Sequence, residues 1–287
     1  MPDVTRERKA TRSRKPKPAA EPAAPKATGR FLSQASTDCP PSRNIMFFHG
    51  KSGIGKSALL AHAPKPVFLI DPLEKGILKL MERGLVPKVD VVPAFRNYAD
   101  FYETLEDLAS GKHGYQTVVI DSITGIEQLL FQYVADELFE GRLNKDGFYA
   151  YGAGPNMCMK NYWPNLFKKI EDVREAGCDV YITGHSIVQA FNSPFGDSYD
   201  RYEPVLDKKS WKAIDRVMDN VFFMDRHIEM DNSKLKSTAK DTDNRIIHCE
   251  WSPAYDAKNR LNMPPIIQMG NSGAEAWKNF SKALEIA

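Results

Sequence analysis

The sequence feature that most restricts the fold is a glycine-rich run at residues 47–60, which reads FFHGKSGIGKSALL. Gly50 to Ser57 match the pattern GxxxxGK[ST] in full. Glycines allow backbone N–H groups to curl around phosphate oxygens, and the start of a following helix favours anions. An apolar strand pattern precedes the run and a helical pattern follows it, which disfavours the alternative of a glycine turn that binds nothing.

The spacing assigns a role to each polar side chain of this loop. Lys56 is expected to reach the β- and γ-phosphates of a nucleotide, and the Ser57 hydroxyl is expected to bind Mg²⁺. The predicted phosphate-binding residues are Gly50, Lys51, Ser52, Gly53, Ile54, Gly55, Lys56, Ser57 and Ala58.

A second candidate for the metal site follows the apolar strand pattern TVVIDS at residues 117–122. In a parallel sheet, Asp121 would lie beside the phosphate loop and hold Mg²⁺ through its water shell. The alternative is an aspartate that caps the next helix. Pairing with the phosphate loop upstream favours the metal role.

Charge is distributed unevenly along the 287 residues. Residues 1–30 hold nine Lys/Arg and three Asp/Glu, whereas the remainder holds 30 Lys/Arg and 34 Asp/Glu. The first segment contains five prolines and almost no large apolar residue, so we expect disorder over residues 1–37, as a solvated tail or a nucleic-acid tether. We expect residues 38–287 to form one ATPase-type domain.

The remaining composition indicates an ordinary soluble protein, with 42% hydrophobic and 26% charged residues. No segment approaches the roughly 18 apolar residues of a membrane span, and no apolar run follows the basic N-terminus, so we expect no secretion signal, no membrane contact and a cytoplasmic location. The four scattered cysteines show no metal-ligand spacing and are expected to be reduced thiols.

Short apolar runs alternate with helical patterns beyond residue 43. This alternation predicts an α/β fold with a mostly parallel sheet flanked by helices. The predicted strands are residues 44–50, 66–71, 89–93, 115–122 and 178–185, with helices at 56–63, 76–84, 98–108, 126–139 and 162–176. A short helix around 211–218, an antiparallel pair at 220–230 and 244–251, and a helix at 274–286 complete the prediction.

Five segments resemble the core of RecA-like P-loop ATPases, in the same order. They read GKSGIGKS, FLIDPLEKG, VVIDSITG, VYITGH and YDAKNRLNMP. Within that group of AAA/RecA-like proteins, the sequence looks most like the short, phage-encoded members proposed to act in single-strand annealing and recombination. The resemblance covers about residues 43–269, and it implies a RecA-like P-loop NTPase core with a C-terminal antiparallel extension.

The resemblance also implies four catalytic roles beside that of Lys56. Glu74 is similar to the carboxylate that polarises the attacking water, although Asp71 and Glu74 stand three apart where two is usual. His185 is similar to the sensor of the γ-phosphate, where RecA has glutamine. Lys258 and Arg260 resemble a pair of cations that reach the nucleotide across a subunit boundary. The alternatives are an exposed glutamate, a structural histidine and two solvated cations.

Two polar, glycine-bearing segments correspond to the DNA-binding loops of the RecA family, namely residues 140–156 and 186–209. Their candidate side chains for charge and base stacking are Arg142, Lys145, Phe148, Tyr149, Tyr151, Phe191, Phe195, Tyr199, Arg201 and Tyr202. Four acidic residues of the second segment, Asp197, Asp200, Glu203 and Asp207, oppose a phosphate backbone. The loops could therefore bind protein, or DNA only weakly.

We hypothesise a Mg²⁺-dependent ATPase that binds ATP between the subunits of a homo-oligomer and acts on single-stranded DNA in phage recombination. Its partners would include recombination or single-strand-binding proteins, in the host cytoplasm if the chain is phage-encoded. The alternatives are a P-loop kinase, a helicase or helicase loader, and an interaction protein that holds nucleotide without DNA activity.

Overall fold

A computed structural model describes residues 43–93, 95–194, 196–231 and 238–286. The expectation of a disordered tail over residues 1–37 lies outside the described residues. The strands are β1 (Ile45–Gly50), β2 (Pro66–Ile70), β3 (Asp90–Val92), β4 (Thr117–Asp121), β5 (Asp179–Phe191), β6 (Tyr199–Pro204), β7 (Asn220–Asp231), β8 (Thr238–His248) and β9 (Ile266–Gln268). The helices are α1 (Lys56–Leu60), α2 (Gly76–Glu82), α3 (Tyr98–Ala109), α4 (Ile123–Leu138), η2 (Ala150–Gly152), α5 (Ala153–Met157), η3 (Cys158–Tyr162), α6 (Trp163–Glu175), α7 (Lys208–Val217) and α8 (Gly273–Ile286).

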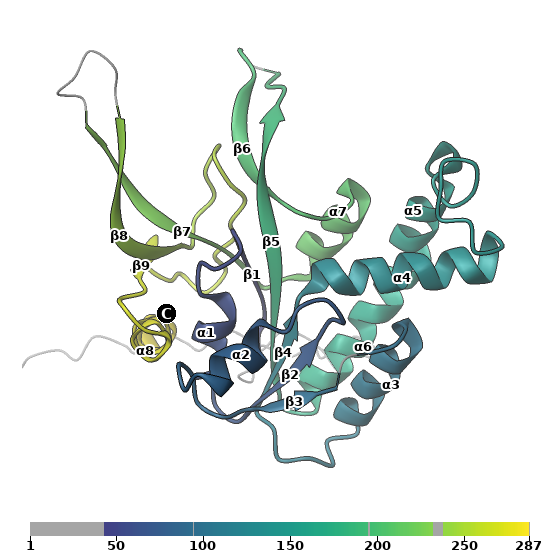
Figure 1. The fold of residues 1–287 in the computed structure, drawn as a ribbon, viewed down its shortest axis with the longest axis horizontal. Coiled ribbons are helices and arrows are strands. Elements are labelled where there is room, and N and C mark those ends of the chain that lie inside the picture. Colours follow the sequence, from purple (N-terminus) through teal and green to yellow (C-terminus); the bar gives the residue numbers. More distant parts are fainter. Residues whose placement is uncertain (1–42, 94, 195, 232–237, 287) are drawn as a thin grey trace, which may run out of the picture. The chain divides into compact units, whose positions relative to one another are not determined.

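The strands form one sheet in the order β3-β2-β4-β5-β1-β7-β8-β9, with β6 paired to β5 (Figure 1). Neighbouring strands from β3 to β7 are parallel. Strand β8 is antiparallel to β7 and β9, and β6 is antiparallel to β5. The prediction of an α/β fold with a mostly parallel sheet and a C-terminal antiparallel extension is confirmed.

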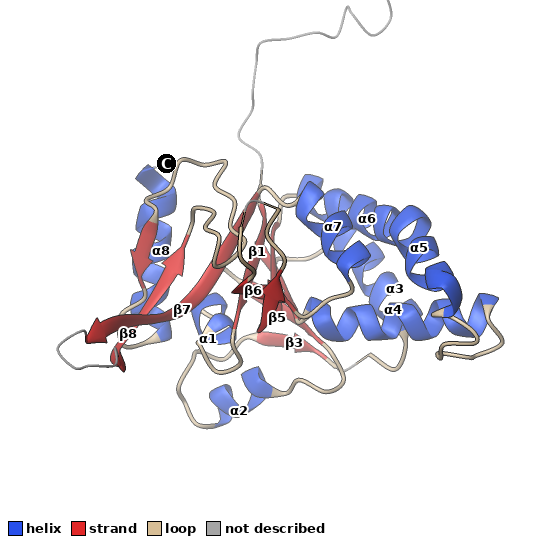
Figure 2. Ribbon diagram, turned by 90° about the horizontal axis from the view of Figure 1, so that it is seen from above, coloured by secondary structure: helices blue, strands red, loops and turns tan. Residues whose placement is uncertain are grey.

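Alternate residues of the central strands enter two separate cores, one on each face of the sheet. Ile45 and Phe47 of β1 pack with α3, α4, α6 and α7, whereas Met46 and Phe48 pack with α1, α2 and α8. Figure 2 shows α8 on one side of the sheet and the larger helical layer on the other. Because both faces are covered, the parallel strands are nearly continuous apolar runs.

The prediction of a long polar loop after the fifth strand is wrong. Strand β5 continues to Phe191 and pairs with β6, so most of residues 186–209 form a hairpin followed by the start of α7. The rings of Phe191 and Tyr199 face each other across the hairpin at 5.3 Å, a type of cross-strand pair that stabilises sheets. The sequence pattern does not predict this pairing, because the residues near the turn include asparagine, glycine and serine, which are typical of loops.

Two hairpins extend beyond the edge of the sheet at which β1 ends. Gly50 pairs with His185 of β5 and with Met224 of β7, and both of these strands continue past that level. Figure 1 shows the β5–β6 and β7–β8 hairpins projecting from the same edge of the sheet and diverging from each other. The loop between β1 and α1 therefore lies at the base of both hairpins.

Two further expectations concern the described residues alone. None of the helices described is long and apolar enough to cross a bilayer. Cys158, Cys178 and Cys249 are buried free thiols, which agrees with the expectation of reduced cysteines for those three.

Candidate nucleotide site

The loop between β1 and α1 follows an inner strand of the sheet, which lies between β5 and β7, at the carboxyl end of the parallel strands. Gly53 and Gly55 have φ angles of 79° and 115°, in the region that only glycine adopts readily. A Cβ at Gly50 would lie 2.3 Å from the carbonyl oxygen of Met224, so β7 also requires a glycine there. The geometry thus explains the glycines of the pattern, and it leaves backbone N–H groups available to phosphate.

Lys56 begins helix α1, and its ammonium group is held inside the loop. The Nζ atom donates hydrogen bonds to the carbonyl oxygens of Gly50 at 2.9 Å and Lys51 at 3.1 Å. Burial lowers the pKa of Lys56 to about 8, although the carboxylates of Asp121 and Glu74 oppose that shift. A triphosphate beside this ammonium would add negative charge and so stabilise the protonated form of Lys56 against the effect of burial.

Ser57 and Asp121 come together as the sequence predicts. The Ser57 hydroxyl donates to one oxygen of the Asp121 carboxylate at 2.6 Å, and Thr183 donates to the other at 2.6 Å. Burial raises the pKa of Asp121, against the effect of these two hydrogen bonds. A hydroxyl and a buried carboxylate are hard oxygen donors, so this pair fits Mg²⁺. Ser57 would bind the ion directly, and Asp121 would hold its water shell.

A turn after β2 positions the carboxylate of Glu74. One oxygen of the buried Asp71 side chain accepts hydrogen bonds from the backbone N–H groups of Leu73, at 2.8 Å, and Glu74, at 3.0 Å. The Glu74 carboxylate meets the Nε2 atom of His185. This hydrogen bond is the main reason that the pKa of Glu74 is lowered, and Lys56 contributes to the same direction. The three-residue spacing thus still brings Glu74 to the site.

Lys258 and Arg260 lie at the opposite end of the strands. Lys258 forms an ion pair with Asp215 at 3.1 Å and donates to the Met218 carbonyl at 3.4 Å. The backbone N–H of Arg260 donates to the side chain of Asn220, which pairs with Met46 at the start of β1. From Met46 to Gly50 the strand spans roughly 13 Å, so the pair is remote from its own phosphate loop.

Two further positions that hold the loop have little local signal in the sequence. The guanidinium of Arg245, on β8, donates to the Gly270 carbonyl at 3.1 Å and lies 3.5 Å from the Ile54 carbonyl. His49 is fully buried; its Nε2 donates to the Asp256 carbonyl at 2.8 Å, and its Nδ1 accepts from Ser186 at 2.8 Å. Burial lowers the pKa of His49 to about 4, so the ring is neutral at physiological pH.

The candidate DNA-contacting residues differ in their exposure to solvent. Phe148 is fully buried against Phe131, so it is not available to stack on a base. Arg201 is also buried and pairs with Asp256, and Phe195 lies outside the described residues. In contrast, Tyr151 is fully exposed.

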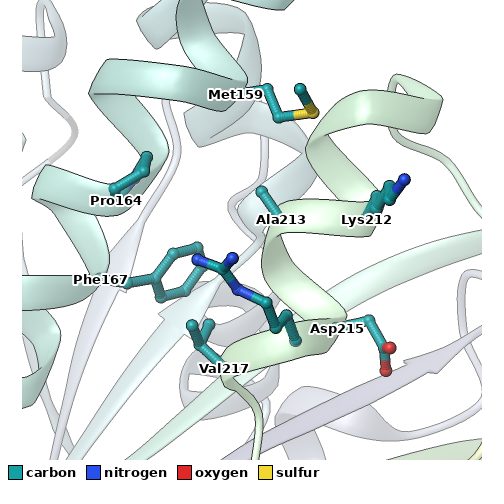
Figure 3. Close-up of a pocket in the computed structure, with 8 residues that line it drawn as sticks. Met159, Pro164, Phe167, Lys212, Ala213, Asp215 and Val217 are labelled. Atoms are coloured by element: carbon teal, nitrogen blue, oxygen red, sulfur yellow. The ribbon is translucent and has the colours of Figure 1, made fainter.

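A cavity of about 490 Å³ lies between α6 and α7, away from the phosphate loop. Its apolar lining comes from Met159, Pro164, Phe167, Ala213 and Val217, and its polar rim includes Lys212 and Asp215 (Figure 3). None of its lining residues contributes to the site of Lys56 and Asp121.

The fold and this site define a P-loop NTPase: a glycine loop between a central strand and a helix, with a lysine, a hydroxyl and a buried aspartate converging on it. Comparison with protein families gives the more particular result. The AAA domain family matches residues 42–261, and the chain belongs to this family. It is therefore a nucleotide-binding protein of the ATPase class. Comparison with curated protein sequences gave no match.

Proposed function

We propose that this protein hydrolyses ATP with Mg²⁺ in an oligomer and couples that reaction to single-stranded DNA. The observation that carries the ATPase part is the convergence of Lys56, Ser57 and Asp121 at the phosphate loop, where Lys56 and Asp121 are buried. The sequence resemblance to phage recombination proteins supports DNA as the partner and recombination or annealing as the process.

The chain supplies a group for each requirement of phosphoryl transfer. Lys56 and the loop N–H groups would bind the phosphates, and Ser57 and Asp121 would hold Mg²⁺, which would supply positive charge to the transferring phosphoryl group. Glu74, kept ionised by its lowered pKa, can accept a hydrogen bond from the attacking water and orient it. His185 holds Glu74 and lies at the base of the β5–β6 hairpin.

Contacts between the phosphate loop and the β5–β6 hairpin support coupling between nucleotide and a bound partner. The ammonium of Lys51 lies 5.2 Å from the ring centroid of Tyr202, on β6. His49, next to the loop, shares a hydrogen bond with Ser186 on β5. A change in the loop on hydrolysis would therefore reach the hairpin through two direct contacts.

The first test removes the ammonium of the phosphate loop. Lys56→Ala should weaken ATP affinity by about tenfold or more, because a buried charge-assisted contact to the phosphates is lost. Lys79→Ala, an exposed lysine of α2, is the matched control and should bind as wild type does. Isothermal titration calorimetry measures both, and undiminished affinity in Lys56→Ala would refute the phosphate-loop assignment.

The second test addresses DNA. Turnover of ATP should rise with single-stranded DNA, and the DNA affinity should fall steeply with salt, as backbone contacts require. Tyr151→Ala should weaken DNA binding by about fivefold or more through loss of stacking, while turnover without DNA is unchanged. If the rate of ATP turnover is the same with and without single-stranded DNA at both low and high salt, the proposed coupling to DNA is wrong, and the proposed ATPase activity is unaffected.

Other outcomes of the same assays identify the alternatives. Phosphoryl transfer to an added acceptor would indicate a kinase, and strand displacement would indicate a helicase. ATP binding without turnover would indicate a protein that holds nucleotide and does not hydrolyse it.

A further inference from the structure

A groove of about 470 Å³ lies on the helical layer, between α3, α4 and the junction of η3 with α6. Four tyrosines from three elements line it: Tyr98 and Tyr102 on α3, Tyr133 on α4 and Tyr162 at the end of η3. None of these residues belongs to the candidate nucleotide site, and the proposed function assigns them no role.

The four rings form one connected cluster. The ring centroids of Tyr98 and Tyr133 are 5.5 Å apart, those of Tyr98 and Tyr102 are 6.1 Å apart, and those of Tyr133 and Tyr162 are 6.2 Å apart. Tyr98 is buried at the base, whereas the other three are half-buried and reach the surface. Burial raises the pKa of Tyr98 and of Tyr162, so these two phenols stay neutral and present uncharged π faces.

The charge around the groove is negative. Glu103 and Glu106 of α3 are exposed at its wall, and its lining, within the residues that the structure describes, includes no lysine or arginine. Rings with an electron-rich face beside carboxylates attract cations, and the attraction is larger where water is partly excluded. The same carboxylates repel a phosphate backbone, which disfavours nucleic acid as the occupant.

The protein already places one cation in this way at the edge of the groove. The ammonium of Lys169, on α6, lies 6.0 Å from the ring centroid of Tyr102 and 3.8 Å from the Glu106 carboxylate. Lys169 also pairs with Asp172 at 3.1 Å. This arrangement shows that the Tyr102 ring and the Glu106 carboxylate can contact the same cation.

We propose that the tyrosine groove binds an arginine or lysine side chain presented by a basic segment of a partner protein. The volume exceeds that of one ammonium or guanidinium group, so there is room for the aliphatic stem of the side chain and its neighbours. The rings would contact the stem and the cation, while Glu103 and Glu106 would neutralise its charge.

The binding test uses a labelled peptide of four arginines separated by glycines, with fluorescence anisotropy at low salt. The control peptide replaces each arginine by citrulline, which keeps the shape and removes the charge. The arginine peptide should bind saturably and the citrulline peptide about tenfold more weakly. Equal binding of the two peptides, or no saturable binding of the arginine peptide, would overturn the proposal.

Variants then locate the bound peptide. Tyr102→Leu removes a π face and should weaken binding about fivefold. Lys169→Gln removes the resident cation and should tighten binding about threefold, whereas Lys168→Gln, the same charge change at the exposed neighbour, should leave it unchanged. Wild-type ATP affinity, retained in each variant, would show that the fold is intact. Equal tightening by both lysine variants, or an unaffected Tyr102→Leu, would place the peptide elsewhere and overturn the proposal.

Discussion

Lys56 is the residue at which burial and charge compete most directly in the phosphate loop. It is only 6% exposed, and two backbone carbonyls are its hydrogen-bond acceptors. Its pKa is lowered to about 8, so the folded chain binds fewer protons than the unfolded chain between that pH and the ordinary lysine value of 10.5. Stability should therefore rise with pH in this window when no nucleotide is bound.

A Lys56→Met variant isolates this contribution. Between pH 7.5 and 9.5, the free energy of unfolding of the wild type should increase by roughly 2 kcal/mol relative to Lys56→Met. Over this range the buried ammonium of the folded wild type loses its proton, and the free-energy cost of burying the charge disappears. Urea unfolding at the two pH values, without nucleotide, measures the difference. A wild type and variant that respond equally to pH would contradict the shifted pKa of Lys56.

At this scale, the site residues that belong to one continuous sequence pattern were predictable. Lys56 and Ser57 follow from the loop spacing, and Asp121 follows from the end of an apolar strand. Thr183 and Arg245 could not be predicted in the same way, because each acts on a residue far away in the chain through a neighbouring strand. The contact between Glu74 and His185 likewise depends on strand order, which the sequence pattern does not give.

At the scale of elements, the apolar strands and amphipathic helices were predictable, since their periodicity is strong. The β5–β6 hairpin was not, because its exposed part carries loop-like residues and is stabilised by a cross-strand partner. The packing of α4 against the turn after β2 could not be predicted from the sequence pattern either. A Cβ on Gly125, in the first turn of α4, would lie 2.3 Å from the carboxylate of Asp71.

This close approach makes Gly125 a test of how the turn positions Glu74. In Gly125→Ala, the added methyl group should displace the Asp71 side chain, which holds the backbone N–H groups of Leu73 and Glu74. We expect kcat to fall about tenfold and stability to fall by about 1–3 kcal/mol, while ATP affinity stays near wild type. Steady-state kinetics and thermal unfolding measure these effects.

Gly114→Ala is the matched control, because no atom lies within 4 Å of its added Cβ and its φ is not positive. It should leave both kcat and stability nearly unchanged. If Gly125→Ala retained full turnover, the turn held by Asp71 would not be what positions the Glu74 carboxylate.

For the whole molecule, the strand directions decide which groups can share a site within one chain. The phosphate loop, Asp121, Glu74 and His185 gather at the carboxyl end of the parallel strands. Arg260 is at the other end and half-exposed, 3.8 Å from Asp219. If Arg260 takes part in hydrolysis, it must therefore act on the nucleotide of another subunit, and turnover must depend on assembly.

Mixing two inactive variants tests that dependence. Arg260→Ala keeps its Glu74, and Glu74→Ala keeps its Arg260, so in a random mixed oligomer about a quarter of the interfaces unite both groups. ATP turnover should be low in each variant alone and recover to about a quarter of the wild-type rate in the equal mixture. Glu74→Ala mixed with a Glu74→Ala, Arg260→Ala double variant is the control and should not recover, since no interface then contains Glu74. An equal mixture that stays as inactive as its components would show that Arg260 does not complete a neighbour's site, whatever the oligomeric state seen by light scattering.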